Sequence, residues 1–126
     1  MLTTAVIPLL IGVLAEPQPL AGTWQLTHVA QDGTVSKGDP SCFLIIQAGS
    51  FTIYKDGEPA MAGEVIIDRR TGTIDFLQDG RLLMPWLVRR QGDTLQLCVP
   101  EGDQRPAMFG AWMGSKQGVS TFRRAK

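Results

Sequence analysis

The chain has 126 residues, the length of a single domain, and its 12 Lys and Arg residues are balanced by 12 Asp and Glu. This balance excludes the strongly basic surface that is typical of proteins binding nucleic acids or anionic membranes. Fourteen Gly and eight Pro, spread among apolar runs, argue against both a helical bundle and a disordered chain. The composition favours an all-β domain of short strands joined by tight turns.

The first fifteen residues have the features of a secretory signal peptide. Residues 5–14 are apolar and uncharged, and the small side chain of Ala15 stands where signal peptidase would cut. The run is too short to span a membrane, which takes about 20 apolar residues, and no Cys follows it to accept a lipid. We therefore predict a signal peptide over 1–15, a secreted or periplasmic domain over 16–126, and no membrane anchor. The alternative is a buried first strand.

Turn-forming dipeptides divide the remaining sequence. Asp32-Gly33, Asp56-Gly57 and Asp79-Gly80 accept the positive φ angles of hairpin turns at low cost. Between such turns, apolar and polar residues alternate as in strands, and no long helical stripe is present. This pattern predicts eight strands, over residues 22–31, 42–48, 51–55, 61–68, 73–77, 82–90, 94–99 and 119–124.

Eight consecutive antiparallel strands leave two unpaired edges, which a short chain can remove by closing the sheet. The predicted fold is a small up-and-down antiparallel β-barrel. A barrel of eight strands is either filled by side chains or takes one small ligand. The apolar residues that alternation turns inward would nearly fill it; they are Trp24, Leu26, Phe51, Ile53, Ile74, Phe76, Leu95, Leu97 and Phe122.

Several sequence blocks together resemble a known family. They are Gly22-Thr23-Trp24, the Gly-Thr-Ile-Asp-Phe block at 72–76, the Gly-Asp-Thr-Leu-Gln-Leu-Cys block at 92–98, Arg105-Pro106, Phe109 and Arg124. Over residues 20–124 the chain resembles a bacterial lipocalin-like domain family, known chiefly from secreted planctomycete proteins. Pro85, Trp86 and His28 depart from the family pattern. The resemblance implies a lipocalin or calycin-like barrel and export, and it implies no activity.

The first strand suggests how one end of the barrel is closed. Gly22 permits a close approach of the chain, and the Trp24 indole is expected to point inward as a plug. In lipocalins an Arg of the last strand lies across this indole, and the resemblance implies that Arg124 does so here. Such a contact is worth about 0.5–2 kcal/mol. We interpret Gly22, Trp24 and Arg124 as structural residues.

The two cysteines, Cys42 and Cys98, leave two interpretations open. In an exported chain an even pair tends to form a disulfide, and this one would stabilise the fold by about 4 kcal/mol in the chain-entropy model. Both residues are expected at the same end of the barrel, but their strands are not neighbours. The alternative is two buried thiols without a redox role.

Catalytic chemistry has little support in the sequence. One His and two distant Cys residues provide neither a metal site nor an activated nucleophile, so we predict no enzyme, no metal and no cofactor. Alternation with Trp24 turns His28 toward the lumen, where it is a candidate polar contact for a ligand. An axial haem ligand is a remoter alternative, and an ordinary interior or rim histidine is the simplest one.

The segment 100–118 lacks a clear strand but contains Met108, Phe109 and Trp112 between glycines. We consider an extra strand, an apolar lid over the mouth, or a loop folded over the core. Two functions follow. The first is a monomeric binding module for a small apolar molecule, contacted by His28, Trp86, Met108, Phe109 and Trp112. The second is an extracytoplasmic barrel with a solid core that binds a protein partner, such as a hydrolase.

Overall fold

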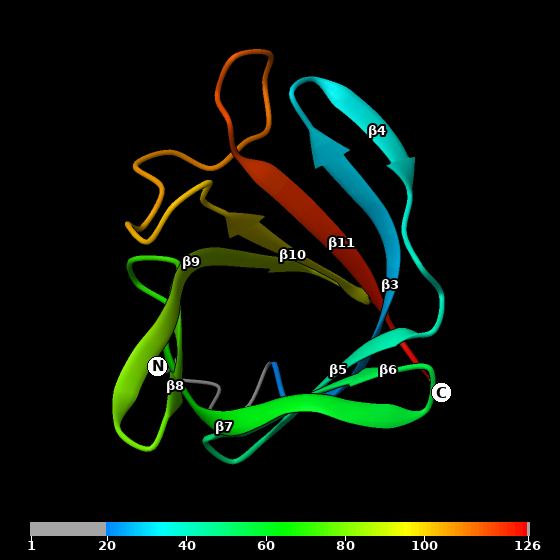
Figure 1. The fold of residues 1–126 in the computed structure, drawn as a ribbon, viewed down its shortest axis with the longest axis vertical. Coiled ribbons are helices and arrows are strands. Elements are labelled where there is room, and N and C mark those ends of the chain that lie inside the picture. Colours follow the sequence, from blue (N-terminus) through cyan, green and yellow to red (C-terminus); the bar gives the residue numbers. More distant parts are fainter. Residues whose placement is uncertain (1–19, 126) are drawn as a thin grey trace, which may run out of the picture.

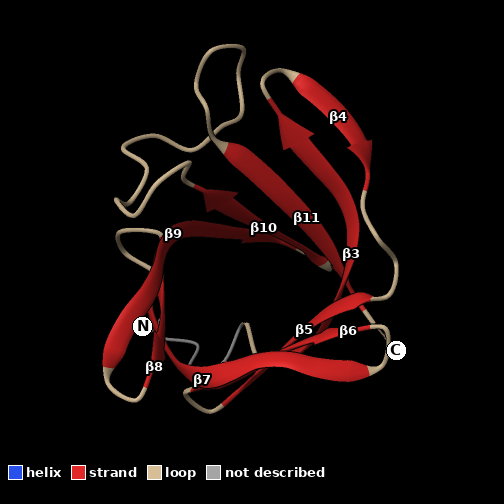
Figure 2. Cartoon of the chain, in the orientation of Figure 1, coloured by secondary structure: helices blue, strands red, loops and turns tan. Residues whose placement is uncertain are grey.

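A computed structural model describes residues 20–125, so the predicted signal peptide over 1–15 lies outside the described residues. Within this part of the chain all regular structure is β, with no helix (Figure 2). The strands are β3 (Gly22–Gln31), β4 (Thr34–Lys37), β5 (Cys42–Gln47), β6 (Ser50–Lys55), β7 (Glu58–Asp68), β8 (Thr73–Gln78), β9 (Arg81–Gln91), β10 (Thr94–Val99) and β11 (Gly118–Arg124).

The sheet closes on itself. From β5 to β11 each strand pairs antiparallel with the next, and β11 returns to pair with β3 (Figure 1). The first half of β3 also pairs with β5, whereas its second half pairs with β4. The predicted fold class is confirmed: the described chain is a closed antiparallel barrel of eight strands, to which β4 adds one strand outside the ring.

The short strand β4 was not predicted. Its residues, Thr34–Lys37, are all exposed, and Val35 is the single apolar side chain among them. Such a segment gives no alternation between a buried and a solvated face, which is the signal that identifies a strand in a sequence. The Asp32-Gly33 turn was the available sign, because such a dipeptide commonly joins two strands of a hairpin.

Large side chains fill the barrel interior. All nine residues predicted to point inward belong to the core or pack against it, which confirms the alternation assigned to their strands. Phe76 lies at the centre, with its ring centroid 4.8 Å from that of Phe51 and 5.3 Å from that of Trp86, both in edge-to-face contact. The part of the barrel around these rings is therefore solid.

One end of the barrel is closed by Trp24, which has no exposed surface. Its Nε1 donates a hydrogen bond to Leu20 O at 3.0 Å, and the Arg124 guanidinium lies 4.5 Å from the ring centroid. A second guanidinium, from Arg90, lies 5.3 Å from the same ring. A Cβ atom at Gly22 would collide with the Arg124 side chain, so only glycine permits this approach. The structure thus brings Gly22, Trp24 and Arg124 together, and we call this end the plugged end.

Candidate functional site

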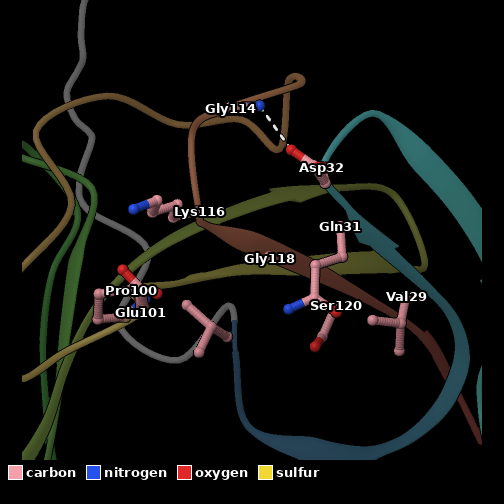
Figure 3. A pocket seen from close by; sticks show the side chains of 10 residues that line it. Val29, Gln31, Asp32, Pro100, Glu101, Gly114, Lys116, Gly118 and Ser120 are labelled. Atoms are coloured by element: carbon pink, nitrogen blue, oxygen red, sulfur yellow. Dashed lines mark hydrogen bonds between the residues drawn. The ribbon is translucent and has the colours of Figure 1, made fainter.

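The opposite end of β3 and β11 is open. A pocket of about 800 Å³, which we call the mouth pocket, lies between these two strands, the end of β10 and the loop that follows it (Figure 3). Three kinds of side chain line it: apolar, neutral polar and charged. The lining residues are Val29, Gln31, Asp32, Val99, Pro100, Glu101, Gly114, Lys116, Gly118 and Ser120.

Side-chain size along β11 explains why space is left here. Phe122 belongs to the core, so Ser120 and Gly118 occupy the same inward face, two and four residues earlier. Across the register, Phe122 pairs with Leu26, whereas Ser120 pairs with Val29. Two large side chains thus fill the plugged half, and smaller ones leave a hollow at the mouth.

The rim of the mouth pocket is fixed by hydrogen bonds to the β3–β4 turn. Asp32 Oδ1 accepts a hydrogen bond from Gly114 N at 2.5 Å, and Gly33 N donates to Ala111 O at 2.6 Å. Glu101 and Lys116 add one charge of each sign to the lining. The pocket therefore offers hydrogen-bonding and charged groups beside apolar walls.

Residues 100–117, which join β10 to β11, form a segment that we call the strap (Figure 2). Its two ends border the mouth pocket, but its middle lies against the outer face of the barrel. There the Arg105 guanidinium donates to Asp75 Oδ1 on β8 at 2.6 Å and to Trp86 O on β9 at 2.9 Å. The Phe109 ring packs under the Arg89 guanidinium, 4.1 Å from the ring centroid. The strap therefore covers the sheet from outside.

The strap is also fixed by Gln117. Its Nε2 donates to Gly110 O at 2.9 Å and to Met108 O at 3.0 Å, and it lies 3.6 Å from the Cys98 sulfur. These bonds fold the strap over Cys98, which is completely buried although it alternates with inward-facing Leu97. Of the three arrangements considered for this segment, the structure thus has a loop folded over the barrel wall, and neither an extra strand nor an apolar lid is formed.

The structure does not bring the five predicted ligand contacts together at the mouth. Trp86 is part of the inner wall and packs on Phe76, while Phe109 lies outside under Arg89. Met108 and Trp112 lie on the strap with 65% and 48% of their surface exposed. In the structure Trp86 follows the alternation of β9 and lies inside, so its predicted place at the mouth is wrong. Alternation does not extend to an irregular loop, so it could not predict the direction of the strap residues.

His28, the fifth predicted contact, is exposed, so its predicted inward direction is wrong. The cause is a bulge in β3: Phe122 pairs with Leu26 and Thr121 pairs with His28, so Thr27 has no residue opposite it. The Thr27 hydroxyl instead donates to Thr121 O at 3.0 Å. One extra residue reverses the alternation, and it turns Val29 rather than His28 inward.

The cysteines are free thiols. Cys42 shares a strand face with the buried Leu44 and Ile46, whereas Cys98 lies on the outer face beneath the strap. The two side chains are thus on opposite sides of the barrel wall, and the disulfide considered from the sequence is not formed. Burial raises the pKa of the Cys42 thiol, and the nearby Asp39 carboxylate adds to this effect.

Two further observations concern residues 20–125. This part of the chain has no group of three or more His, Cys, Asp or Glu side chains arranged to hold a metal ion. It also contains no helix of the length and hydropathy needed to cross a membrane.

Comparison of the chain with protein-family models, curated proteins and solved structures finds no significant match.

The residues that form the mouth pocket were not predicted from the sequence. One sign was present, because Gly118 and Ser120 share the parity of Phe122 and are small. The geometry of the barrel and its mouth is therefore the basis for a functional proposal.

Proposed function

We propose that this protein is a lipocalin-like barrel that binds a small molecule in the mouth pocket. The observation that carries the proposal is a hollow of about 800 Å³ at the end of the barrel opposite the Trp24 plug. Binding pockets for small molecules commonly measure about 300–1,000 Å³. The solid core around Phe76 limits the ligand to the mouth, so it would not enter the barrel deeply.

The lining favours an amphiphilic ligand over a purely apolar one. Val29, Val99 and Pro100 supply apolar contact, whereas Gln31 and Ser120 supply hydrogen-bonding groups. Burying a polar group without a partner is costly, so the ligand should carry polar atoms that satisfy these side chains. We propose a compact molecule with one apolar part and one polar or charged part.

Export and the absence of catalysis complete the proposal. The apolar segment before Glu16 supports delivery of the domain to the periplasm or the cell exterior. The mouth pocket contains Asp32 and Glu101, and Asp32 already accepts the hydrogen bond from Gly114. This arrangement gives no nucleophile with an adjacent base, so we propose binding rather than turnover.

A fluorescent amphiphile tests the pocket. Anilinonaphthalene sulfonate has an aromatic part and one negative charge, and we expect it to bind the mature protein at one saturable site. Ser120→Phe places a large ring on the inward face of β11 and should weaken that binding by at least about tenfold, because it occupies the pocket. Ser50→Phe is the matched control, since Ser50 is exposed at the start of β6 and does not line the pocket.

The two serine variants distinguish binding in the mouth pocket from binding elsewhere. Equal weakening by both serine variants would mean that the probe does not occupy the mouth pocket. Unchanged binding in Ser120→Phe would contradict the proposal directly. Native mass spectrometry of the exported protein then identifies the natural ligand as an adduct that the Ser120→Phe variant lacks.

Exposed apolar side chains on the strap favour a second function, binding of a protein partner. Met113, Met108 and Trp112 are 79%, 65% and 48% exposed, and large exposed apolar side chains on one loop are typical of an interaction surface. Trp112→Ser combined with Met113→Ser should abolish binding of a purified partner, while Ser120→Phe should leave it intact. The opposite pattern would assign the function to the pocket alone.

A further inference from the structure

Charge is distributed unevenly around the barrel wall, although the chain as a whole is neutral. Five consecutive strands of the sheet, β9, β10, β11, β3 and β4, contain no Asp or Glu (Figure 1). Arg90 and Arg124 of these strands lie over the Trp24 ring at the plugged end. The outer face of the five strands carries four further basic side chains, all exposed: Arg89, Arg123, His28 and Lys37. This part of the wall is therefore basic.

Strand pairing arranges polar side chains of this face in one row. Residues directly opposite each other in a sheet lie on the same face, and adjacent strands are about 4.8 Å apart. Four such intervals extend the row over about 19 Å, and Arg123 lies beside it, two residues beyond Thr121. We call it the polar row, and its members, which pair in turn, are Arg89, Gln96, Thr121, His28 and Lys37.

Side-chain contacts hold the Arg89 end of the polar row in place. Arg89 Nε donates a hydrogen bond to Gln96 Oε1 at 2.8 Å, and Gln96 Nε2 donates to Thr121 Oγ1 at 3.1 Å. The Arg89 guanidinium also packs on the Phe109 ring. These contacts use Nε and one face of the guanidinium, so its two terminal nitrogens remain for a ligand. A side chain that is already ordered loses less conformational entropy when it binds.

Within residues 20–125, the cations of this face have no carboxylate partner. None of Arg89, Arg123 and Lys37 forms an ion pair there. The carboxylates of the adjoining turns make other contacts: Asp32 with Gly114 N, Asp39 with Ser41 N and Lys55 Nζ, and Asp93 with Arg124 Nε. An external anion would therefore find these cations unpaired.

We propose that the polar row binds an acidic polysaccharide, whose anionic groups lie on Arg89, Arg123 and Lys37. Guanidinium and ammonium groups hold carboxylates and sulfates by charge-assisted hydrogen bonds. Between these cations, the amide of Gln96 and the hydroxyl of Thr121 are groups that both donate to and accept from sugar hydroxyls. The row thus matches a chain in which charges alternate with neutral polar groups.

The shape and position of the polar row also bear on its ligand. The outer face of a closed barrel is convex, so an extended chain can follow the row, whereas a flat membrane would contact only part of it. No member of the row lines the mouth pocket. The proposal therefore stands or fails independently of the proposed function.

Two probes test the polar row in the mature protein by isothermal calorimetry at fixed ionic strength: oligogalacturonate, which carries carboxylates, and an oligomer of dextran sulfate. Arg89→Gln combined with Lys37→Gln removes two exposed cations of the row, so the fold should be kept. We expect this row variant to weaken binding by about tenfold or more, because two charge-assisted contacts are lost. Arg70→Gln combined with Arg81→Gln is the matched control, since it removes two exposed positive charges outside the row.

The control separates the polar row from net charge. Loss of binding in the row variant and not in the control supports the proposal, as does a lack of binding of neutral dextran. An equal loss in the two double variants would mean that net charge alone attracts the probes, and it would overturn the proposal. Saturable binding of neither acidic probe would also overturn it. So would tighter binding of a single-stranded oligonucleotide, or of phosphatidylglycerol vesicles, that the row variant loses.

Discussion

The two ends of the barrel are made by the same strands, β3 and β11 (Figure 1), yet one is filled by side chains and the other is hollow. At the plugged end Arg124 pairs with Trp24 and Phe122 pairs with Leu26, whereas at the mouth Ser120 pairs with Val29. The backbone topology is shared, so it does not determine where a hollow forms. The size of the inward side chains along two strands determines it.

The ends also differ in how they are held. The plugged end depends on a buried indole between guanidinium groups, with Arg124 also donating to Ala21 O at 3.1 Å. The open end depends on the strap, which is fixed to the barrel by polar contacts such as the one between Arg105 and Asp75. We therefore expect that a substitution at the plugged end destabilises the whole barrel. A substitution that breaks a contact of the strap should release only the strap.

Removal of the plug should have the largest effect. Trp24→Ala deletes a fully buried side chain, and we expect a loss of about 3–5 kcal/mol in the free energy of unfolding, measured by urea denaturation. Trp112→Ala is the matched control on the strap, where 48% of the side chain is exposed; it should change stability by about 0.5 kcal/mol or less. Similar losses in the two variants would show that the plug is not a stability centre.

A smaller loss is expected when the contact across the plug is disturbed. Gly22→Ala places a Cβ against the Arg124 guanidinium at a φ of 144°, so Arg124 must leave the indole. We expect a loss of about 1–3 kcal/mol by urea denaturation, since strain and a displaced contact add.

Gly80→Ala separates these two causes. Gly80 also has a positive φ, of 77°, but a Cβ there has no neighbour within 4 Å. A loss in Gly22→Ala no greater than that in Gly80→Ala would mean that backbone strain alone, and not the Arg124 contact, explains the effect.

The closed barrel could be predicted because its signals are local. Asp-Gly turns mark the hairpins, and strict alternation along β6, β8 and β10 places Phe51, Phe76 and Leu95 inside. The direction of His28 could not be predicted in this way, because the bulge at Thr27 depends on pairing with β11, which is far away in the sequence. Alternation along one strand predicts the inward residues only up to a bulge. Beyond the bulge, which pairing with a distant strand determines, the inward positions shift by one residue.

The strap was unpredictable for a related reason. Its position depends on individual contacts between distant residues, such as Arg105 with Asp75 and Gly114 with Asp32. Neither pair has a periodic signature, since a loop has no repeating face. The mouth pocket depends on both the strap and the bulge, and so the sequence indicated its end of the barrel but not its residues.

Release of the strap should have an effect that is confined to one segment of the chain. Arg105→Gln removes the partly buried ion pair with Asp75, and we expect a local loss of about 1–3 kcal/mol. Hydrogen exchange should become faster in residues 100–117 while the amides of β8–β10 keep their protection. Arg81→Gln, which removes an exposed charge outside the strap, should leave both regions unchanged. Uniformly faster exchange over the barrel would instead make the strap part of the global fold.

The smallest expected effect is a difference in alkylation rate between the two cysteine thiols. It distinguishes Cys42, on the inner side of the barrel wall, from Cys98, on the outer side. Because burial raises the pKa of Cys42, less of the reactive thiolate is present at pH 8 than in the urea-unfolded chain, so alkylation by iodoacetamide should be slower. The rate should keep rising with pH beyond the point where the unfolded chain reaches its plateau.

Cys98 should be alkylated more slowly than Cys42, because the strap covers it completely. Opening of the strap is the step that exposes Cys98, so Arg105→Gln should accelerate its alkylation several-fold and leave that of Cys42 unchanged, as measured by mass spectrometry of digested protein. Equal acceleration at both cysteines would mean that the barrel wall and the strap open together. In that case the plugged end and the mouth would unfold as one cooperative unit. A substitution at the mouth pocket would then also destabilise the Trp24 plug.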